Sequence, residues 1–399
     1  MNRIDKGNYI LEVSWGCPSD RYPLHGLFQF DQAKALTDVG EKIVFLALDM
    51  RSIRRWRKWG VSFRTRYGIP VCEYSFPYGP FSPEKKYRIQ DRGFDRSMAK
   101  IERRYGKPGC VHFHGVMEAI SGMAYCVERG IPYVITEHIT PVEEGEKVHS
   151  RMVDAYAHAS RIIAVSNRLA EDVRIVYGAH ADAVIPNIVD LEIFCRAAND
   201  HSEMASFTGD ADKQREHDEF VFITAARLVG GKGLSVLLNA FSTLPDTTRL
   251  IVMGDGPLKA ELEHEAGLLG ITDRVSFTGA YLRPEFAGRL QDADCFVLPS
   301  ESETFGIVYV EAMAAGVPVI ATKCGGPEDF VDEFSGILVP VGDVGGLILA
   351  MKKMIDSAYK YDRLQISEKC RCRFSPDVIA TQIKQVVADA LNVYDASSK

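Results

Sequence analysis

The sequence predicts an α/β protein made of two Rossmann-like domains, whose parallel sheets face one another across a cleft. Its 399 residues exceed the roughly 150 residues of a typical domain and therefore indicate two domains. Short, nearly continuous apolar runs alternate with helical patterns, as is typical of parallel sheets covered by helices on both faces. This alternation is interrupted once, by a polar and charged segment at 196–218, and then resumes.

The expected strands follow in order along each half of the chain. Six apolar runs precede the interruption, at 9–14, 43–48, 110–114, 133–138, 161–166 and 183–186. Five follow it, at 220–226, 249–254, 275–279, 295–300 and 317–322. Helical patterns such as FQFDQAKALTDVG and MEAISGMAYCVERG separate them. Because ligands of open parallel sheets bind beyond the carboxyl ends of the strands, binding residues are expected in the loops after these runs.

The domain boundaries follow from the same order. We expect an N-terminal domain at 1–195, a linker or exposed insertion at 196–218 and a C-terminal domain at 219–375. The last helix, 376–399, starts at the pair Ser375–Pro376, which suits an N-cap followed by proline in the first turn. Its apolar face predicts that it packs back on the N-terminal domain.

Composition argues against several functional classes. The net charge of −7 argues against nucleic-acid binding, because such a site needs a basic surface. No run approaches the ~20 apolar residues of a membrane span, and the first residues do not resemble a secretory signal, so a cytoplasmic protein is expected. The nine cysteines form no CxxC pair and are expected as reduced thiols.

One stretch, 51–67, carries seven basic residues and no acidic one, with aromatic residues between them. One interpretation is a solvated helix or loop edge. The other is attraction to the anionic inner face of the cell membrane, to which each nearby basic residue contributes about 1 kcal/mol. The basic residues are Arg51, Arg54, Arg55, Arg57, Lys58, Arg64 and Arg66.

The segment SESETFGIVYVEAMAAG, 300–316, carries two carboxylates eight positions apart in a largely apolar run. The preceding run predicts a strand, so Glu303 lies in the loop after it and Glu311 in the following helix, which Gly316 ends. The first N–H groups of that helix lack internal partners and suit a phosphate, which Gly306 allows to approach closely. Carboxylates would repel the phosphate, so they suit hydroxyl groups on either side, as in a sugar nucleotide.

A diphosphate also requires cations. The segment ARLVGGKGLSVLLNAF, which follows the run at 220–226, offers Arg227 and Lys232 in a glycine-rich loop. GGKG alone is a weak motif, because it lacks the GxxxxGK[ST] frame of a P-loop. Together with Glu303 and Glu311, it predicts a site for a nucleotide sugar.

These segments resemble the motifs of the retaining glycosyltransferases of family four, which have the GT-B fold. The 300–316 segment resembles the E-x7-E motif of this family. RLVGGKG resembles the R-x4-K-G segment that binds phosphate in the family, and VIPNIVD resembles its P-N-x-V-D hinge. This similarity is strong over 185–340. In the N-terminal half, PLHGLFQFDQAKAL resembles the family's glycine loop and first helix, and VHFHG resembles its histidine segment.

The resemblance implies a role for each candidate residue. Glu303 would accept hydrogen bonds from the donor sugar, and Glu311 would bind the ribose hydroxyls. Arg227 and Lys232 would stabilise the departing nucleotide diphosphate. His114 would contact the transferred sugar, with His138 as a weaker candidate beside it and Asn187 fixing the interdomain hinge. Further donor contacts, mostly through backbone groups, are implied for Gly26, Gly279, Ala280, Tyr281, Phe305, Gly306 and Ile307.

A metal site is not expected. The triplet DAD occurs at 210–212 and 292–294, and metal-dependent glycosyltransferases hold a divalent ion with a DxD motif. The first copy lies in the polar segment, and the second closes a helix just before an expected strand. Because Arg227, Lys232 and a helix N-terminus already serve the diphosphate, we expect neither a metal nor a cofactor.

The sequence therefore predicts a retaining, metal-independent glycosyltransferase that uses a UDP- or GDP-linked sugar. The expected acceptor is a glycan or lipid-linked intermediate of cell-surface glycan synthesis. In such an enzyme the β-phosphate oxygen takes the acceptor proton on the face from which the leaving group departs, so Glu303 is not expected to be a nucleophile. The alternatives are a GT-B-shaped nucleotide-sugar epimerase and, from another class, a two-domain solute-binding protein.

Overall fold

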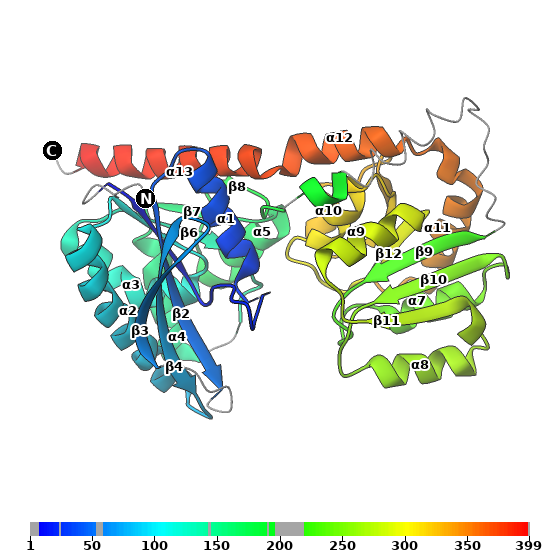
Figure 1. Cartoon of the computed structure of the whole chain (residues 1–399), viewed down its shortest axis with the longest axis horizontal. Coiled ribbons are helices and arrows are strands. Elements are labelled where there is room, and N and C mark those ends of the chain that lie inside the picture. The colour runs from blue at the N-terminus through cyan, green and yellow to red at the C-terminus, as the bar shows by residue number, and fades with distance from the viewer. Residues whose placement is uncertain are drawn as a thin grey trace. The chain divides into compact units, whose positions relative to one another are not determined.

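The computed structural model describes residues 8–23, 25–52, 59–142, 145–189, 191–195 and 219–397. The chain divides into two compact units (Figure 1). The first unit comprises Met1–Ile188 and Pro376–Lys399, and the second comprises Val189–Ser375.

The first unit is an eight-stranded sheet in the order β3-β4-β2-β1-β5-β6-β7-β8, parallel except for the antiparallel edge strand β3. Its strands are β1 (Ile10–Ser14), β2 (Ile43–Ser52), β3 (Gly60–Arg66), β4 (Ile69–Tyr78), β5 (Cys110–Phe113), β6 (Tyr133–Glu137), β7 (Arg161–Ala164) and β8 (Ala183–Val184). Its helices are α1 (Leu27–Asp38), α2 (Pro83–Tyr105), α3 (Val116–Arg129), α4 (Glu146–Ala157), α5 (Asn167–Tyr177) and α13 (Pro376–Ser397).

Two apolar cores lie on opposite faces of this sheet. One contains Phe94 of α2, Ala119 of α3 and Met152 of α4. The other contains Phe30 of α1 and Ile383 of α13, so the last helix belongs to the first unit and lies beside α1 (Figure 1). This packing on both faces explains why most positions of the central strands are apolar.

The second unit is a six-stranded parallel sheet in the order β11-β10-β9-β12-β13-β14. Its strands are β9 (Phe220–Ala225), β10 (Thr248–Met253), β11 (Val275–Gly279), β12 (Cys295–Leu298), β13 (Val319–Thr322) and β14 (Gly336–Val339). Its α-helices are α7 (Leu234–Ser242), α8 (Lys259–Leu268), α9 (Arg283–Asp292), α10 (Ile307–Ala314), α11 (Val344–Ser357) and α12 (Arg363–Phe374). Short 3-10 turns are η1 (Thr272–Arg274), η2 (Gly326–Asp329) and η3 (Ala358–Lys360).

Each sheet has a point at which the strand order reverses direction. In the first unit the chain builds outward from β1 through β2 to β4 and then returns to β5 on the other side of β1. In the second unit the same reversal occurs between β9 and β12. Ligands of doubly wound sheets bind at such a reversal, beyond the carboxyl ends of the strands. Ligand-binding residues are therefore expected in the loops after β1, β5, β9 and β12.

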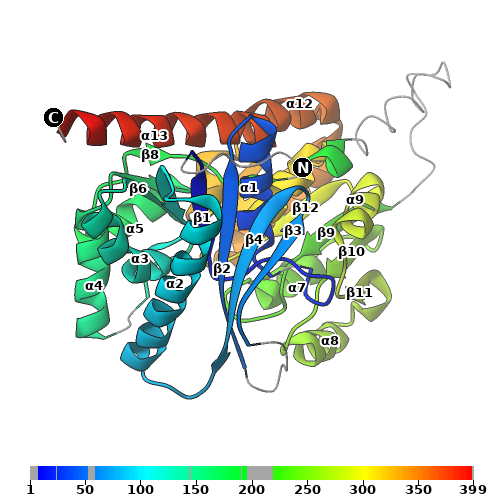
Figure 2. The same cartoon turned by 60° about the vertical axis from the view of Figure 1, so that its left-hand side comes forward.

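The basic stretch is partly an edge strand, which corrects the expectation of a solvated helix or loop edge. Gly60–Arg66 form β3, which pairs antiparallel with β4 beside β2 (Figure 2). Arg64 donates a hydrogen bond to the carbonyl of Pro18 at 2.9 Å, and Arg66 lies 3.6 Å from Asp20. The basic residues of GVSFRTR obscure its strand pattern in the sequence. Arg54, Arg55, Arg57 and Lys58 lie outside the described residues, as does the side chain of Arg51.

The first unit ends at Ile188, seven residues before the expected boundary at 195. The reason is packing, because Phe194 is fully buried and its ring lies 6.0 Å from that of Phe286 in the second unit. The strands β3, β4 and β14 were not predicted from the sequence. None of the helices within the described ranges is both long and apolar enough to cross a membrane.

Candidate functional site

The loops after β9 and β12 bring two of the predicted residues into direct contact. The ammonium of Lys232 lies 2.7 Å from Glu303 Oε1, although the two residues are 71 positions apart. The hydroxyl of Ser300 donates to the same oxygen at 2.7 Å. The side chains of Lys232 and Glu303 keep 26% and 13% of their surface exposed. A charge-assisted contact at the strand reversal is thus accessible to a ligand.

Close backbone packing positions Lys232. Gly233 precedes α7 with a φ of 67°, and a Cβ at this position would lie 1.9 Å from the carbonyl oxygen of Pro299. The N–H of Glu301 donates to the carbonyl of Gly231 at 2.8 Å. The glycines therefore allow the two loops to touch, and the lysine between them is held against Glu303.

The N-terminus of α10 provides uncapped backbone donors. Gly306 is its N-cap with φ 95°, and no side chain caps the helix. The loop before it is fixed by hydrogen bonds from Glu303 N to Cys324 O at 3.0 Å and from Gly326 N to Glu303 O at 2.9 Å. Phe305 is buried against Phe330, with ring centroids 5.5 Å apart, so only its backbone is available to a ligand. The free N–H groups near Ile307 suit an anion.

Glu311 is not an isolated carboxylate, because Arg283 at the start of α9 is its partner. Arg283 Nε lies 3.1 Å from Glu311 Oε1, and the two side chains are 21% and 8% exposed. Burial, with the charge of Glu311 as the next cause, raises the pKa of Tyr281 in the adjoining loop. Arg283 was not predicted from the sequence. The one indication of such a residue was that a buried carboxylate in α10 requires a cation.

The other predicted donor-side residues lie on the same edge of the sheet. Gly279, Ala280 and Tyr281 form the loop between β11 and α9, and the Gly279 carbonyl accepts a hydrogen bond from Gly254 N at 2.8 Å. Arg227 follows β9 and is exposed. Its guanidinium makes no hydrogen bond or ion pair within the described part of the chain, so it can turn toward an anion.

In the first unit, the predicted His114 belongs to a buried cluster with Glu12 and His112. Glu12 Oε2 lies 2.7 Å from His114 Nε2, and Glu12 Oε1 lies 3.2 Å from His112 Nδ1. The second nitrogen of His112 lies 2.7 Å from the hydroxyl of Thr136. Burial acts to raise the pKa of Glu12, but the two histidines outweigh it and lower this pKa to about 2. Glu12 is therefore an anion that orients both rings.

The histidine chain continues to two further predicted residues. His114 Nδ1 lies 3.1 Å from His138 Nε2, and His138 Nδ1 lies 2.8 Å from the side-chain amide of Asn187. Burial lowers the pKa of His114 and, more strongly, that of His138, so both rings are neutral at neutral pH. The Glu12 carboxylate accepts a hydrogen bond from His114 Nε2. Asn187 completes the chain, because its Oδ1 accepts a hydrogen bond from His138 Nδ1.

The cluster of Glu12, His112 and His114 has the geometry of a metal-ligand set, with ligand atoms within 4.8 Å of one another. These atoms already satisfy one another by hydrogen bonds, so a metal would have to displace those bonds. Sequence reasoning identified His114 but missed Glu12. The alternation of β5 places His112 and His114 on one face, but only the strand order shows that Glu12 lies beside them.

Gly26 has a packing role at the start of α1. Its φ is 69°, and a Cβ there would lie 2.4 Å from the carbonyl oxygen of Gly16. The loop after β1 therefore folds tightly onto itself, and Gly26 holds it closed. Its predicted contact with a diphosphate remains a prediction.

Two further carboxyl groups at this edge, those of Glu118 and Glu137, were not predicted from the sequence. Glu137, at the end of β6, accepts hydrogen bonds from the N–H of Val116 at 3.0 Å and from the hydroxyl of Tyr156 at 2.7 Å. Burial and the neighbouring Glu137 raise the pKa of Glu118 to about 8. The N-terminus of α3, which begins at Val116, is thus occupied by a carboxyl group of the protein itself.

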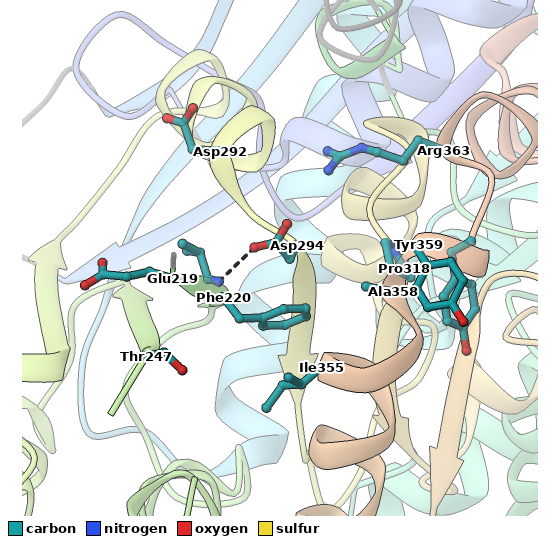
Figure 3. Close-up of a pocket in the computed structure, with 12 residues that line it drawn as sticks. Glu219, Phe220, Thr247, Asp292, Asp294, Pro318, Ile355, Ala358, Tyr359 and Arg363 are labelled. Carbon is teal, nitrogen blue, oxygen red and sulfur yellow. Dashed lines mark hydrogen bonds between the residues drawn. The ribbon is translucent and has the colours of Figure 1, made fainter. Parts of the chain in front are cut away.

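The second DAD triplet lies at the opposite edge of its sheet. Asp294 accepts a hydrogen bond from the N–H of Val221 at 2.9 Å, beside the amino ends of β9 and β12 (Figure 3). With Asp292, Phe220 and Tyr359 it lines a cavity of about 540 Å³. Asp294 therefore joins two strands, far from the loops that carry Lys232 and Glu303. The first triplet lies outside the described residues.

Two parallel α/β sheets, with binding residues at the carboxyl edge where the strand order reverses, define the GT-B glycosyltransferase class. A crystal structure of the Anabaena protein Alr3699/HepE in complex with UDP matches the fold with a TM-score of 0.71. It is 22% identical and covers 95% of this chain and 99% of that chain.

Sequence comparison gives the family. The family described as Glycosyltransferase Family 4 matches residues 50–193, and the family described as Glycosyl transferases group 1 matches residues 208–370. A D-inositol 3-phosphate glycosyltransferase from Paenarthrobacter aurescens is 30% identical over 302 residues, which cover 68% of this chain and 71% of that protein. The lipopolysaccharide core biosynthesis glycosyltransferase LpsD from Rhizobium meliloti is 29% identical over 311 residues, covering 73% and 89%. The chain therefore belongs to the family 4 glycosyltransferases of the group 1 type.

Proposed function

We propose that this glycosyltransferase moves a sugar from a UDP- or GDP-linked donor to a glycan or lipid-linked acceptor, with retention and without a metal ion. The observation that carries the proposal is the contact between Lys232 and Glu303 beside the uncapped N-terminus of α10. It combines a cation, free backbone donors and a carboxylate at one strand reversal. A nucleotide sugar requires these three kinds of group side by side.

The donor diphosphate is assigned to the N-terminus of α10, where backbone N–H groups and the helix dipole favour an anion. Lys232 and Arg227 neutralise the charge that grows on the diphosphate as the sugar departs. Preorganised groups of this kind contribute about 10²-fold to 10³-fold each to a rate. The Lys232 ammonium is already held in place, whereas Arg227 is free to close on the ligand.

The two glutamates have different tasks in this proposal. Glu303 accepts hydrogen bonds from donor-sugar hydroxyls with the oxygen that Lys232 and Ser300 do not contact. Glu311 accepts from the ribose hydroxyls, and Arg283 holds its carboxylate in place. A carboxylate already paired with an ammonium and a hydroxyl is a poor nucleophile, so Glu303 is assigned to binding.

Retention follows if the acceptor attacks on the face that the diphosphate leaves. The β-phosphate oxygen then takes the acceptor proton, and no side-chain base is required. In the first unit, His114 is assigned to the transferred sugar, with Glu12 holding its ring orientation. Glu12 is thus a positioning residue rather than a catalytic one.

The compared proteins support the substrate classes. The HepE structure contains UDP, and LpsD is named for lipopolysaccharide core biosynthesis. On this basis we assign the acceptor to cell-surface glycan synthesis, with the enzyme in the cytoplasm or at the inner face of the membrane. The basic stretch 51–67 is the proposed contact with anionic lipid.

The test is incubation with UDP- and GDP-sugars in the presence and absence of candidate acceptors. Acceptor-dependent release of nucleotide diphosphate, unchanged by EDTA, is expected. Conversion of the sugar without an acceptor would instead indicate an epimerase, and tight binding without turnover would indicate a solute-binding protein. Loss of activity in EDTA that added metal restores would contradict metal independence.

Variants then test the site. Lys232→Ala and Glu311→Ala are expected to weaken nucleotide binding and to reduce transfer by about 10²-fold or more. Lys259→Ala is the matched control, because Lys259 lies in α8 with an exposed side chain 3.7 Å from Glu263. Near-normal turnover in both site variants would refute the assignment.

A further inference from the structure

Trp15 is a large apolar side chain left exposed at the carboxyl edge of the first sheet. It directly follows β1, at the strand reversal between β1 and β5, and 44% of its surface is accessible. An exposed tryptophan at a ligand-binding edge is informative, because this side chain is usually highly buried and is enriched where proteins bind partners. Neither the donor site nor the histidine cluster makes use of it.

The surrounding structure holds this indole in place. The Trp15 ring is perpendicular to the ring of His25, with centroids 4.5 Å apart and an interplanar angle of 89°. His25 Nε2 lies 3.2 Å from Asp49 Oδ1, and Asp49 is fully buried within β2. A Cβ on Gly16 would lie 2.5 Å from the His25 ring, so this ring packs directly against the backbone of Gly16. The tryptophan is therefore a preorganised surface rather than a loose side chain.

The charges at this edge determine what can lie on that surface. Asp49 lies within β2 and Glu137 at the end of β6, and Glu118 lies close to Glu137. Glu137 already accepts the N–H of Val116, so the N-terminus of α3 is not open to a phosphate. The three carboxyl groups are buried, and none of them is a cation that could bind the phosphate of an anionic acceptor. The surface instead suits an uncharged ring with an apolar C–H face and a rim of hydroxyls.

We propose that Trp15, positioned by His25 and Asp49, is the platform of an acceptor subsite that stacks a neutral pyranose ring. The acceptor would then present a sugar residue to this edge, rather than a phosphorylated polyol or the phosphate of a lipid carrier. Hydroxyls at the rim of the ring would reach the second nitrogen of His25, for which the described residues provide no partner. This inference rests on the proposed transfer reaction and names the acceptor class for that reaction.

The first experiment measures transfer kinetics with the full chain. Trp15→Ala is expected to raise the KM for a saccharide acceptor about tenfold, equivalent to about 1.4 kcal/mol, while the KM for the nucleotide sugar stays unchanged. Trp15→Phe, which retains an aromatic face, is expected to restore most of the loss. Phe334→Ala is the matched control, because Phe334 is similarly exposed at 51% but precedes β14 at the amino edge of the second sheet.

A second experiment does not depend on turnover. The chain contains three tryptophans, Trp15, Trp56 and Trp59, so Trp56→Phe combined with Trp59→Phe leaves Trp15 as the only indole. Titration of this variant with maltose, cellobiose, lactose and inositol 1-phosphate is followed by tryptophan fluorescence. We expect a blue shift with at least one disaccharide and none with inositol 1-phosphate.

The outcomes separate this inference from the proposed function. If nucleotide binding and transfer occur but Trp15→Ala leaves every acceptor KM unchanged, the platform is wrong and the transferase assignment stands. If the phosphorylated polyol shifts the fluorescence and no disaccharide does, or if no probe does, the acceptor class is wrong. If no nucleotide binds the wild-type chain at all, the proposed function itself fails.

Discussion

Replacing Glu12 by glutamine removes one negative charge from the buried histidine cluster with little change in shape. Glu12 is fully buried and lies within hydrogen-bond distance of His112 and His114. Glutamine can still accept a hydrogen bond from His114, but it loses the charge-assisted contacts to both rings. We expect the first unit to lose stability and His114 to lose its fixed orientation.

The size of the effect follows from the pKa of Glu12. The attraction and hydrogen bonds of the two histidines overcome burial and lower this pKa from an ordinary 4.5 to about 2. At about 1.4 kcal/mol for each pH unit, the paired carboxylate contributes about 3 kcal/mol to the folded state at neutral pH. Because the pKa is lower in the folded chain, this contribution is present above about pH 4.5 and is lost as the pH falls toward 2.

The assay is urea unfolding followed by tryptophan fluorescence, which reports on the first unit because all three tryptophans lie within Met1–Ile188. Glu12→Gln should lower the free energy of unfolding by about 3 kcal/mol at neutral pH, and its difference from wild type should shrink at about pH 3. Glu171→Gln is the control, because Glu171 forms an exposed pair with Arg174 at 2.6 Å and should show no measurable change. A loss below about 1 kcal/mol for Glu12→Gln, or a difference independent of pH, would refute the reasoning.

Three further predictions concern other parts of the chain. Arg283→Met leaves Glu311 buried without this cation, so we expect the free energy of unfolding of the second unit to fall by about 1–3 kcal/mol. Calorimetry should also show weaker nucleotide binding. The control Arg289→Met, on the exposed side of α9, should change neither quantity. Gly233→Ala should abolish nucleotide binding, because its Cβ would lie 1.9 Å from the Pro299 oxygen, whereas Gly230→Ala has open space and should be tolerated. If the basic stretch 51–67 binds membrane, sedimentation with vesicles should show binding that requires anionic lipid and weakens as the salt concentration rises. Equal binding to neutral vesicles would mean that this stretch is only a solvated surface.

Local sequence was sufficient for the alternation of strands and helices and for the position of the donor segment. Strands buried on both faces need apolar residues throughout, so β9 to β13 stand out as continuous runs. The edge hairpin of β3 and β4 was missed because its residues are mixed in polarity. The strand-to-helix turn at Gly306 places Glu303 in a loop and Glu311 in α10 by spacing alone.

The sequence by itself determined which residue types stand at each loop, because turn glycines, strand ends and helix starts are set by neighbours along the chain. It did not determine their partners. Lys232 meets Glu303 across 71 positions, Arg283 meets Glu311, and Glu12 meets two histidines one strand away. Those contacts depend on strand order, which only the tertiary structure decided, because a charge can be buried only where a group from a distant segment compensates it.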